Sequence, residues 1–238
     1  MRLFGLSSPA LLALALARGV LAQNSTFFHG ATIIAFDEGS SRPNVLRNSS
    51  LLVVNDRIAG LFENNSTDEL PPGTEVIDAT GRIISPGFID THHHLWQTAY
   101  KTIASNTTLA QYFQRYGEYG PAAQHFNPDE IRVGQLAGCL ELLYAGTTTV
   151  VDHAHGDFSN ETMDAALDAT LESGIRSFFA PAIHELGNGY SIEDQRYKLL
   201  SLVDDPRLDN GTVTLGLAYD RFYMASQTEV DSFWNIVR

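Results

Sequence analysis

The pattern of apolar and polar positions divides the chain into three stretches. A compact apolar run lies near the N-terminus, short β-type runs follow up to residue 84, and strands then alternate with helices. We therefore predict a leader at residues 1–22, β-structure at residues 23–84 and an α/β domain at residues 85–238.

The first 22 residues have the features of a secretory signal peptide. Arg2 supplies a positive charge, Leu11–Leu16 is a short apolar run, and the small residue Ala22 favours cleavage before Gln23. A membrane anchor would need a longer uncharged stretch. We expect a secreted protein with no membrane attachment once the signal peptide is removed.

The stretch from residue 23 to residue 84 alternates like β-structure. Turn-forming Asn, Asp, Gly and Pro residues separate its apolar runs. It is too short to close a sandwich alone, so we interpret it as part of a small β-sandwich. The predicted strands are 32–36, 50–54, 57–61, 73–78 and 82–84.

After residue 85, helix signals separate the apolar strands. Asn127, Ser191 and Ser226 are predicted N-caps, and Glu229 would complete a capping box with Ser226. Gly146 is the predicted C-cap of the first of these helices. Alternating strands and helices imply a parallel sheet. The predicted strands are one that ends at His92, then 147–152, 175–183 and 213–218, and the helices are 127–146, 161–173, 191–203 and 226–237.

Four strand–helix units are half of the eight that a closed parallel barrel needs. The predicted fold class is therefore α/β, an incomplete (β/α)8 TIM-type barrel of about four units preceded by part of a small β-sandwich. The alternative is an open four-stranded sheet with helices on both faces. An unpaired strand at the edge of the fourth unit would expose backbone donors and apolar side chains, so we expect the isolated chain to self-associate there.

Three histidines follow the first strand of this domain. Residues two apart on a strand face the same side, so His92 and His94 project together and His93 points away. Two neutral imidazoles on one face form half of a zinc-type site. The alternative is a surface histidine cluster that binds no metal.

Two blocks of sequence, Val76–His94 and Ala145–Asp152, resemble the amidohydrolase superfamily, in its chlorohydrolase and aminohydrolase (deaminase-like) branch. The resemblance implies a metal-dependent hydrolase of carbon–nitrogen bonds in a small molecule, with the site at the carboxyl face of a barrel. His92 and His94 match the metal ligands of the first strand, and Gln97 matches a position in the substrate pocket. Zinc is the expected metal, with iron as an alternative.

The same resemblance implies further ligands that these 238 residues do not contain. They are histidines after strands five and six and an aspartate after strand eight, so we expect a truncated chain. The alternative is a catalytically inactive fragment or pseudoenzyme that binds metal weakly. Deamination, amide hydrolysis and dechlorination share these motifs, and the substrate stays open.

Other polar residues follow the later strands. We assign His155 and His184 to the substrate pocket, and one of His153, His155 or His184 could instead be a third metal ligand. Asp152, Glu185, Tyr219 and Asp220 end strands at the same predicted edge.

Charge and sequons refine this picture. A net charge of −13 makes nucleic acid a poor partner. The lone cysteine, Cys139, permits no internal disulfide and is interpreted as a buried apolar residue.

Seven asparagines head Asn-X-Ser/Thr sequons, and the sequons of Asn64 and Asn65 overlap. The predicted glycosylation sites are Asn24, Asn48, Asn65, Asn106, Asn160 and Asn210.

Overall fold

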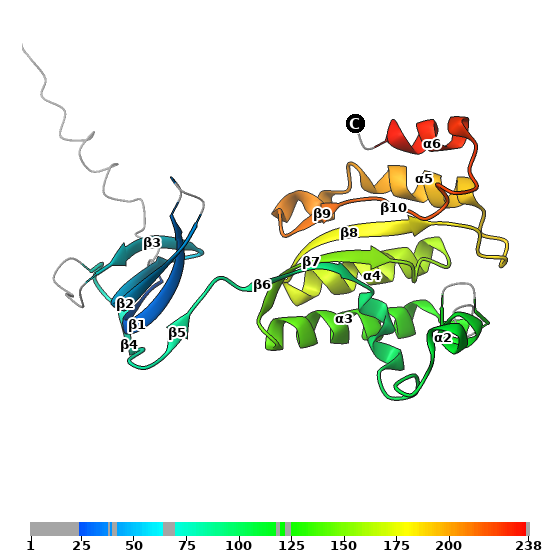
Figure 1. Cartoon of the computed structure of the whole chain (residues 1–238). Coiled ribbons are helices and arrows are strands. Elements are labelled where there is room, and N and C mark those ends of the chain that lie inside the picture. Colours follow the sequence, from blue (N-terminus) through cyan, green and yellow to red (C-terminus); the bar gives the residue numbers. More distant parts are fainter. Residues whose placement is uncertain are drawn as a thin grey trace, which may run out of the picture. The chain divides into compact units, whose positions relative to one another are not determined.

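The computed structural model describes residues 24–37, 39, 42–63, 70–117, 120–121 and 125–236. The chain divides between Pro86 and Gly87 into two compact units, and each has its own core. Figure 1 shows the order of their elements. The predicted signal peptide, Asn64 and Asn65 lie outside the described residues. Within those residues, every helix is too short or too polar to cross a membrane.

The first unit is a five-stranded mixed sheet built around β1 (Ser25–Asp37). All five predicted strands are present, but the first two are thirteen residues long because bulges around Gly30 let β1 and β2 continue past an interruption in pairing. Ala31 and Ile33 are buried on one face of this sheet. The other strands are β2 (Arg42–Val54), β3 (Arg57–Phe62), β4 (Glu75–Asp78) and β5 (Ile83–Ile84).

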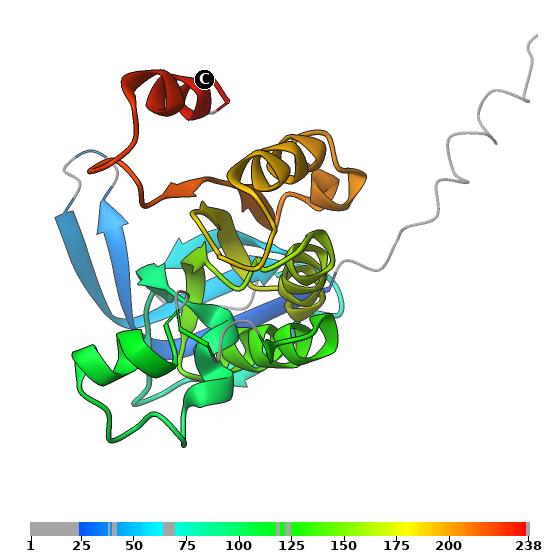
Figure 2. The ribbon, with the colours of Figure 1, turned by 90° about the vertical axis from the view of Figure 1, so that its right-hand side faces the viewer.

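The second unit has a parallel sheet whose strands lie in chain order. Because right-handed connections between consecutive neighbours return on the same side, the helices cover one face of this sheet (Figure 2). The alternative with helices on both faces is therefore wrong. The strands are β6 (Phe88–His93), β7 (Thr147–Ala154), β8 (Arg176–Ile183) and, beside β8, β9 (Val213–Leu215) with β10 (Ala218–Tyr219).

The fourth strand is broken, whereas the sequence predicted one strand over residues 213–218. Gly216 and Leu217 leave regular pairing between β9 and β10. The Gly216 N–H still donates to the Phe179 carbonyl at 2.7 Å, so the break shortens the ladder without detaching the chain from β8.

The helices begin where the predicted caps lie. Asn127 and Ser191 each accept the N–H three residues on. The first predicted helix ends earlier than expected, since Ala145 is its cap and Gly146 follows with φ 89°. The helices are η1 (Leu95–Tyr100), α2 (Leu109–Arg115), α3 (Pro128–Tyr144), α4 (Asn160–Ser173), α5 (Ile192–Leu202), η3 (Pro206–Asn210) and α6 (Gln227–Trp234).

Ser226 caps α6, but the predicted capping box is incomplete. The Ser226 hydroxyl accepts from the Glu229 N–H at 3.2 Å. The Glu229 carboxylate instead accepts from the Tyr219 hydroxyl at 2.7 Å and from Arg221 at 3.0 Å. Tertiary partners therefore outcompete the local cap.

Two elements that the sequence did not predict, η1 and α2, follow the histidines directly. A Cβ on Gly134 or Gly138 of α3 would lie 2.5 Å from a carbonyl oxygen of η1, at Trp96 and Leu95 respectively. The two glycines thus let the backbone of η1 lie against α3, which holds the chain segment just after His94.

Candidate metal centre

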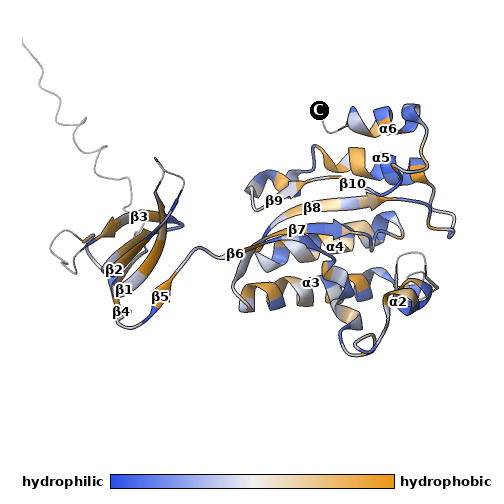
Figure 3. Cartoon of the chain, in the orientation of Figure 1, coloured by the Kyte–Doolittle hydropathy of each residue, from blue (hydrophilic) through white to orange (hydrophobic). Residues whose placement is uncertain are grey.

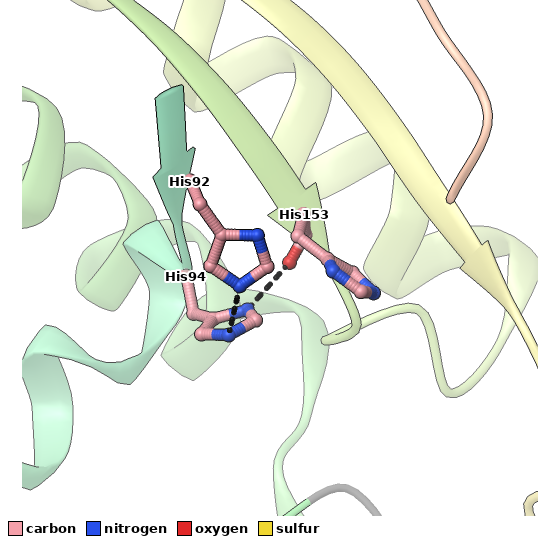
Figure 4. Close-up of side chains that lie close together, drawn as sticks. All are labelled: His92, His94 and His153. Carbon is pink, nitrogen blue, oxygen red and sulfur yellow. Dashed lines mark hydrogen bonds between the residues drawn. The ribbon is translucent and has the colours of Figure 1, made fainter. Parts of the chain in front are cut away.

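The rings of His92 and His94 meet at the carboxyl end of β6 (Figure 4). Their Nε2 atoms are 3.2 Å apart. His93 does not join this pair, since its Nδ1 lies 3.0 Å from Asp90 Oδ2. The common face of His92 and His94 is what strand alternation predicts.

The tautomer of His94 follows from its second nitrogen. Its Nδ1 lies 2.9 Å from the carbonyl oxygen of His153, which can only accept, so Nδ1 carries the proton. Nε2 then holds a lone pair that faces His92. Burial lowers the pKa of His94 to about 4, which keeps the ring neutral and able to bind a metal.

His153 belongs to the same cluster because of the alternation along β7. Val150, Asp152 and Ala154 are buried toward the helices, so His153 faces the other side of the sheet. One ligand atom from each of His92, His94 and His153 lies within 4.8 Å of the others. In Figure 3 the carboxyl end of β7 is coloured as hydrophilic, whereas the neighbouring β8 is more hydrophobic.

The donor set fits zinc. Bonds of 2.0–2.1 Å in a tetrahedron place two ligand nitrogens roughly 3.3 Å apart, close to the 3.2 Å between His92 and His94. Neutral imidazoles are suitable ligands for zinc and for iron. His92 and His94 could therefore hold a divalent cation between their Nε2 atoms, and a nitrogen of His153 lies nearby.

His155 and His184 lie at the same edge but are buried, with exposures of 2% and 1%. The His155 ring centroid is 4.2 Å from that of His94, and the Trp96 indole N–H donates to His155 Nδ1 at 3.3 Å. Burial and the neighbouring histidines lower the pKa of His155, and burial lowers that of His184 to about 4. Both rings are therefore enclosed by protein and do not lie on an open surface.

Gln97 is half-buried on η1. Its amide exchanges hydrogen bonds with the Tyr112 hydroxyl, at 2.8 Å from Nε2 and 3.0 Å to Oε1. This pair joins η1 to α2 close to the histidines.

The other polar residues at the strand ends contact different neighbours. Asp220 accepts from His153 Nε2 at 2.9 Å, and this hydrogen bond lowers the pKa of Asp220. Glu185 pairs with Arg221 at 2.8 Å. Asp152 faces away from the histidines, into the core below the helices.

Sequence reasoning missed the polar network around Asp152. The carboxylate accepts from the Leu95 N–H at 3.2 Å and from Gln135 Nε2 at 2.6 Å, and Gln135 also donates to Thr170 at 2.9 Å. Burial raises the pKa of Asp152 to about 6. The sequence did contain a signal for this network: Asp152 stands at an inward-facing position of a β-branched strand. A carboxylate at such a position requires buried hydrogen-bond partners.

The predicted glycosylation sites with described side chains are exposed: Asn24, Asn48, Asn106 and Asn160. Asn160 accepts from the Tyr190 hydroxyl at 2.7 Å. Asn210 closes η3, and modification of these asparagines stays a prediction.

Among similar proteins is the 5-methylthioadenosine/S-adenosylhomocysteine deaminase of Thermococcus kodakarensis, 30% identical over 141 residues. The match covers 59% of this chain and 30% of that protein. The chain therefore spans about a third of the length of this curated relative.

Two solved structures share the fold. Guanine deaminase from C. acetobutylicum superposes with a TM-score of 0.68 and 21% identity, over 90% of this chain and 50% of that one. Atrazine chlorohydrolase from Arthrobacter aurescens TC1, complexed with zinc, gives 0.59 and 24%, over 82% and 46%. Residues 83–232, more than half of the chain, match the model of the Amidohydrolase family, and the chain therefore belongs to the amidohydrolase family.

Proposed function

We propose that this chain is part of a metal-dependent hydrolase that acts on a carbon–nitrogen bond of a small molecule, in the manner of a deaminase. The observation that carries the proposal is the His92–His94 pair at the carboxyl end of a parallel sheet, with Nε2 atoms 3.2 Å apart, in an amidohydrolase chain. The deaminase among its relatives supports a nitrogen-bearing ring as substrate.

His92 and His94 would hold the cation, and zinc is favoured because a similar structure is complexed with zinc. A bound divalent cation of this kind lowers the pKa of a water ligand and so supplies a hydroxide near neutral pH. His94 stays neutral through burial, and its Nδ1–H···O=C bond to His153 fixes the ring. Gln97, His155 and His184 are proposed to shape the substrate pocket.

We also propose a fold, a cellular location and an assembly state for the whole protein. The four parallel strands support a partial (β/α)8 barrel, and the first sheet supports part of a composite β-sandwich. The N-terminal residues and the exposed sequons support secretion with N-glycosylation. Apolar side chains near the β10 edge, including Phe222 and Tyr223, support self-association.

The test combines metal analysis with an ammonia-release assay. Purified protein is loaded with zinc, and adenosine-type nucleosides, guanine and aminotriazines are offered as substrates. We expect bound zinc in the wild type, loss of zinc in His92→Gln and His94→Gln, and ammonia release that a chelator abolishes. Zinc bound without turnover of any compound would favour the inactive alternative, and absence of zinc binding would overturn the proposal.

A further inference from the structure

The Asp152 carboxylate is fully buried near the end of β7. Its two oxygens have separate partners, since Oδ1 accepts from the Leu95 N–H at 3.2 Å and Oδ2 accepts from Gln135 Nε2 at 2.6 Å. A buried carboxylate is costly, and apolar side chains of similar volume often stabilise such a position equally well. What this carboxylate holds in place therefore deserves an explanation beyond stability, and the Leu95 N–H provides one.

Leu95 is the first residue of η1, and His94 holds the N-cap position before it. The first N–H groups of a helix have no partner inside the helix, and the side chain of the N-cap residue commonly accepts from one of them. The His94 side chain makes no such bond. Its Nε2 faces His92 and its Nδ1 donates to the His153 carbonyl. Asp152 supplies an acceptor for the start of η1 from the neighbouring strand.

His94 is thus held through two consecutive residues of β7. The bond from the Leu95 N–H to Asp152 fixes the backbone that follows His94, and the bond from Nδ1 to the His153 carbonyl fixes the ring. Metal–ligand distances tolerate deviations of only about 0.2 Å. The placement of His94 Nε2, 3.2 Å from that of His92, therefore depends on the backbone anchor as well as on the ring anchor.

We propose that Asp152 is a positioning residue of the metal centre: its carboxylate caps η1 in place of the His94 side chain and sets the backbone from which His94 reaches the cation. The inference rests on the proposed metal-binding function. It adds no ligand to His92 and His94, and it assigns a role at the site to a side chain that faces away from the cation.

Asparagine and alanine at this position separate the cap from the charge. Asp152→Asn keeps a side-chain carbonyl that can accept from the Leu95 N–H. Its amide would face Gln135, whose Oε1 makes no hydrogen bond within the described part of the chain, so a turn of the Gln135 amide would pair the two. Thr170 would lose the Gln135 donor but still donates to the Ala166 carbonyl at 2.9 Å. Asparagine preserves the cap, and alanine removes it.

The test measures the Zn²⁺ affinity of the full chain by chelator competition, together with the visible absorption of the Co²⁺ form. We expect the wild type to bind zinc. Asp152→Ala should weaken binding by about tenfold to a hundredfold and change the Co²⁺ spectrum, and Asp152→Asn should restore both nearly to wild type. Leu199→Ala, a large-to-small change at a buried position of α5, is the control for lost stability. It should leave affinity and spectrum unchanged.

A double variant covers the case in which Asp152→Ala does not fold. Asp152→Val with Gln135→Leu replaces the carboxylate and its amide partner by apolar side chains, a change that protein interiors often accept at little cost. It still leaves the Leu95 N–H without its acceptor. We expect wild-type circular dichroism and the weakened zinc binding of Asp152→Ala.

The outcomes separate the inference from the proposed function. Wild-type affinity in Asp152→Ala or in the double variant would overturn the inference while leaving the His92–His94 site intact. An Asp152→Asn protein as weak as Asp152→Ala would overturn it too, and so would an equal loss in Leu199→Ala. A wild type that binds no zinc would overturn the proposed function as well.

Discussion

The backbone N–H of Leu95 donates to the buried carboxylate of Asp152 at 3.2 Å. One residue earlier, His94 Nδ1 donates to the His153 carbonyl at 2.9 Å. These bonds lie just beyond the last pair between β6 and β7, which joins His93 to Asp152. Side-chain hydrogen bonds thus replace the ladder at the point where the histidines leave it.

Asp152→Ala should destabilise the fold by roughly 3 kcal/mol, because it leaves the Leu95 N–H and a Gln135 donor buried without their acceptor. Asp152→Asn should cost less, since its carbonyl can still accept from Leu95. Urea unfolding monitored by circular dichroism measures both. Asp231→Asn, on the exposed side of α6, is the control and should change stability by less than about 0.5 kcal/mol. A similarly small effect of Asp152→Ala would show that the carboxylate does not hold this segment.

Gly138→Ala should also destabilise the protein, although alanine is the better helix former by about 1 kcal/mol. The added Cβ would lie 2.5 Å from the Leu95 carbonyl oxygen and 2.8 Å from Thr98 Oγ1, so η1 must move away from α3. We expect a net loss of roughly 2 kcal/mol in urea unfolding. Val133→Ala, at an exposed position of the same helix, controls for changes in α3 itself. A stabilised Gly138→Ala protein would contradict the close approach of the two elements.

Stability should fall as the pH is lowered from about 6.5 toward 4, partly because of His184. Burial holds its pKa at about 4 in the folded state, against an ordinary value of 6.5. The unfolded chain therefore binds a proton in this window that the folded chain does not, which favours unfolding at the acid end. Between pH 8 and pH 5 the contribution is roughly 2 kcal/mol.

His184→Gln removes this titrating group and should reduce the stability difference between pH 8 and pH 5 by about that amount. Urea midpoints at both pH values give the comparison, with His125→Gln, at an exposed position, as the control. An unchanged difference in His184→Gln would show that His184 is not protonated on unfolding in this range.

Cys139 should be inert in the folded protein. Its side chain is fully buried on α3, and burial raises the pKa of its thiol to about 12, so little thiolate forms at pH 8. We expect no reaction with a disulfide reagent such as DTNB under native conditions and one equivalent after unfolding in guanidinium. Rapid reaction of the native protein would mean that α3 opens readily around this residue.

The alternation of the sequence was sufficient to predict the β-rich first unit and the strand–helix order of the second. Cap residues such as Asn127, Ser191 and Ser226 located the starts of helices because their effect is local. The rings of His92 and His94 lie on one face because a strand repeats every two residues. Local physics operates over a few residues, which is why these features could be read from the chain.

Tertiary structure alone decided which distant side chains meet. His153 and Asp220 are 67 residues apart and come together because strand order places their ends around β8. Glu229 leaves its expected cap for Tyr219 and Arg221, and Asp152 turns from the sheet edge into a buried network with Gln135. Each outcome depends on the register of parallel strands and on which face a helix covers, and both are set by packing between segments far apart in the sequence.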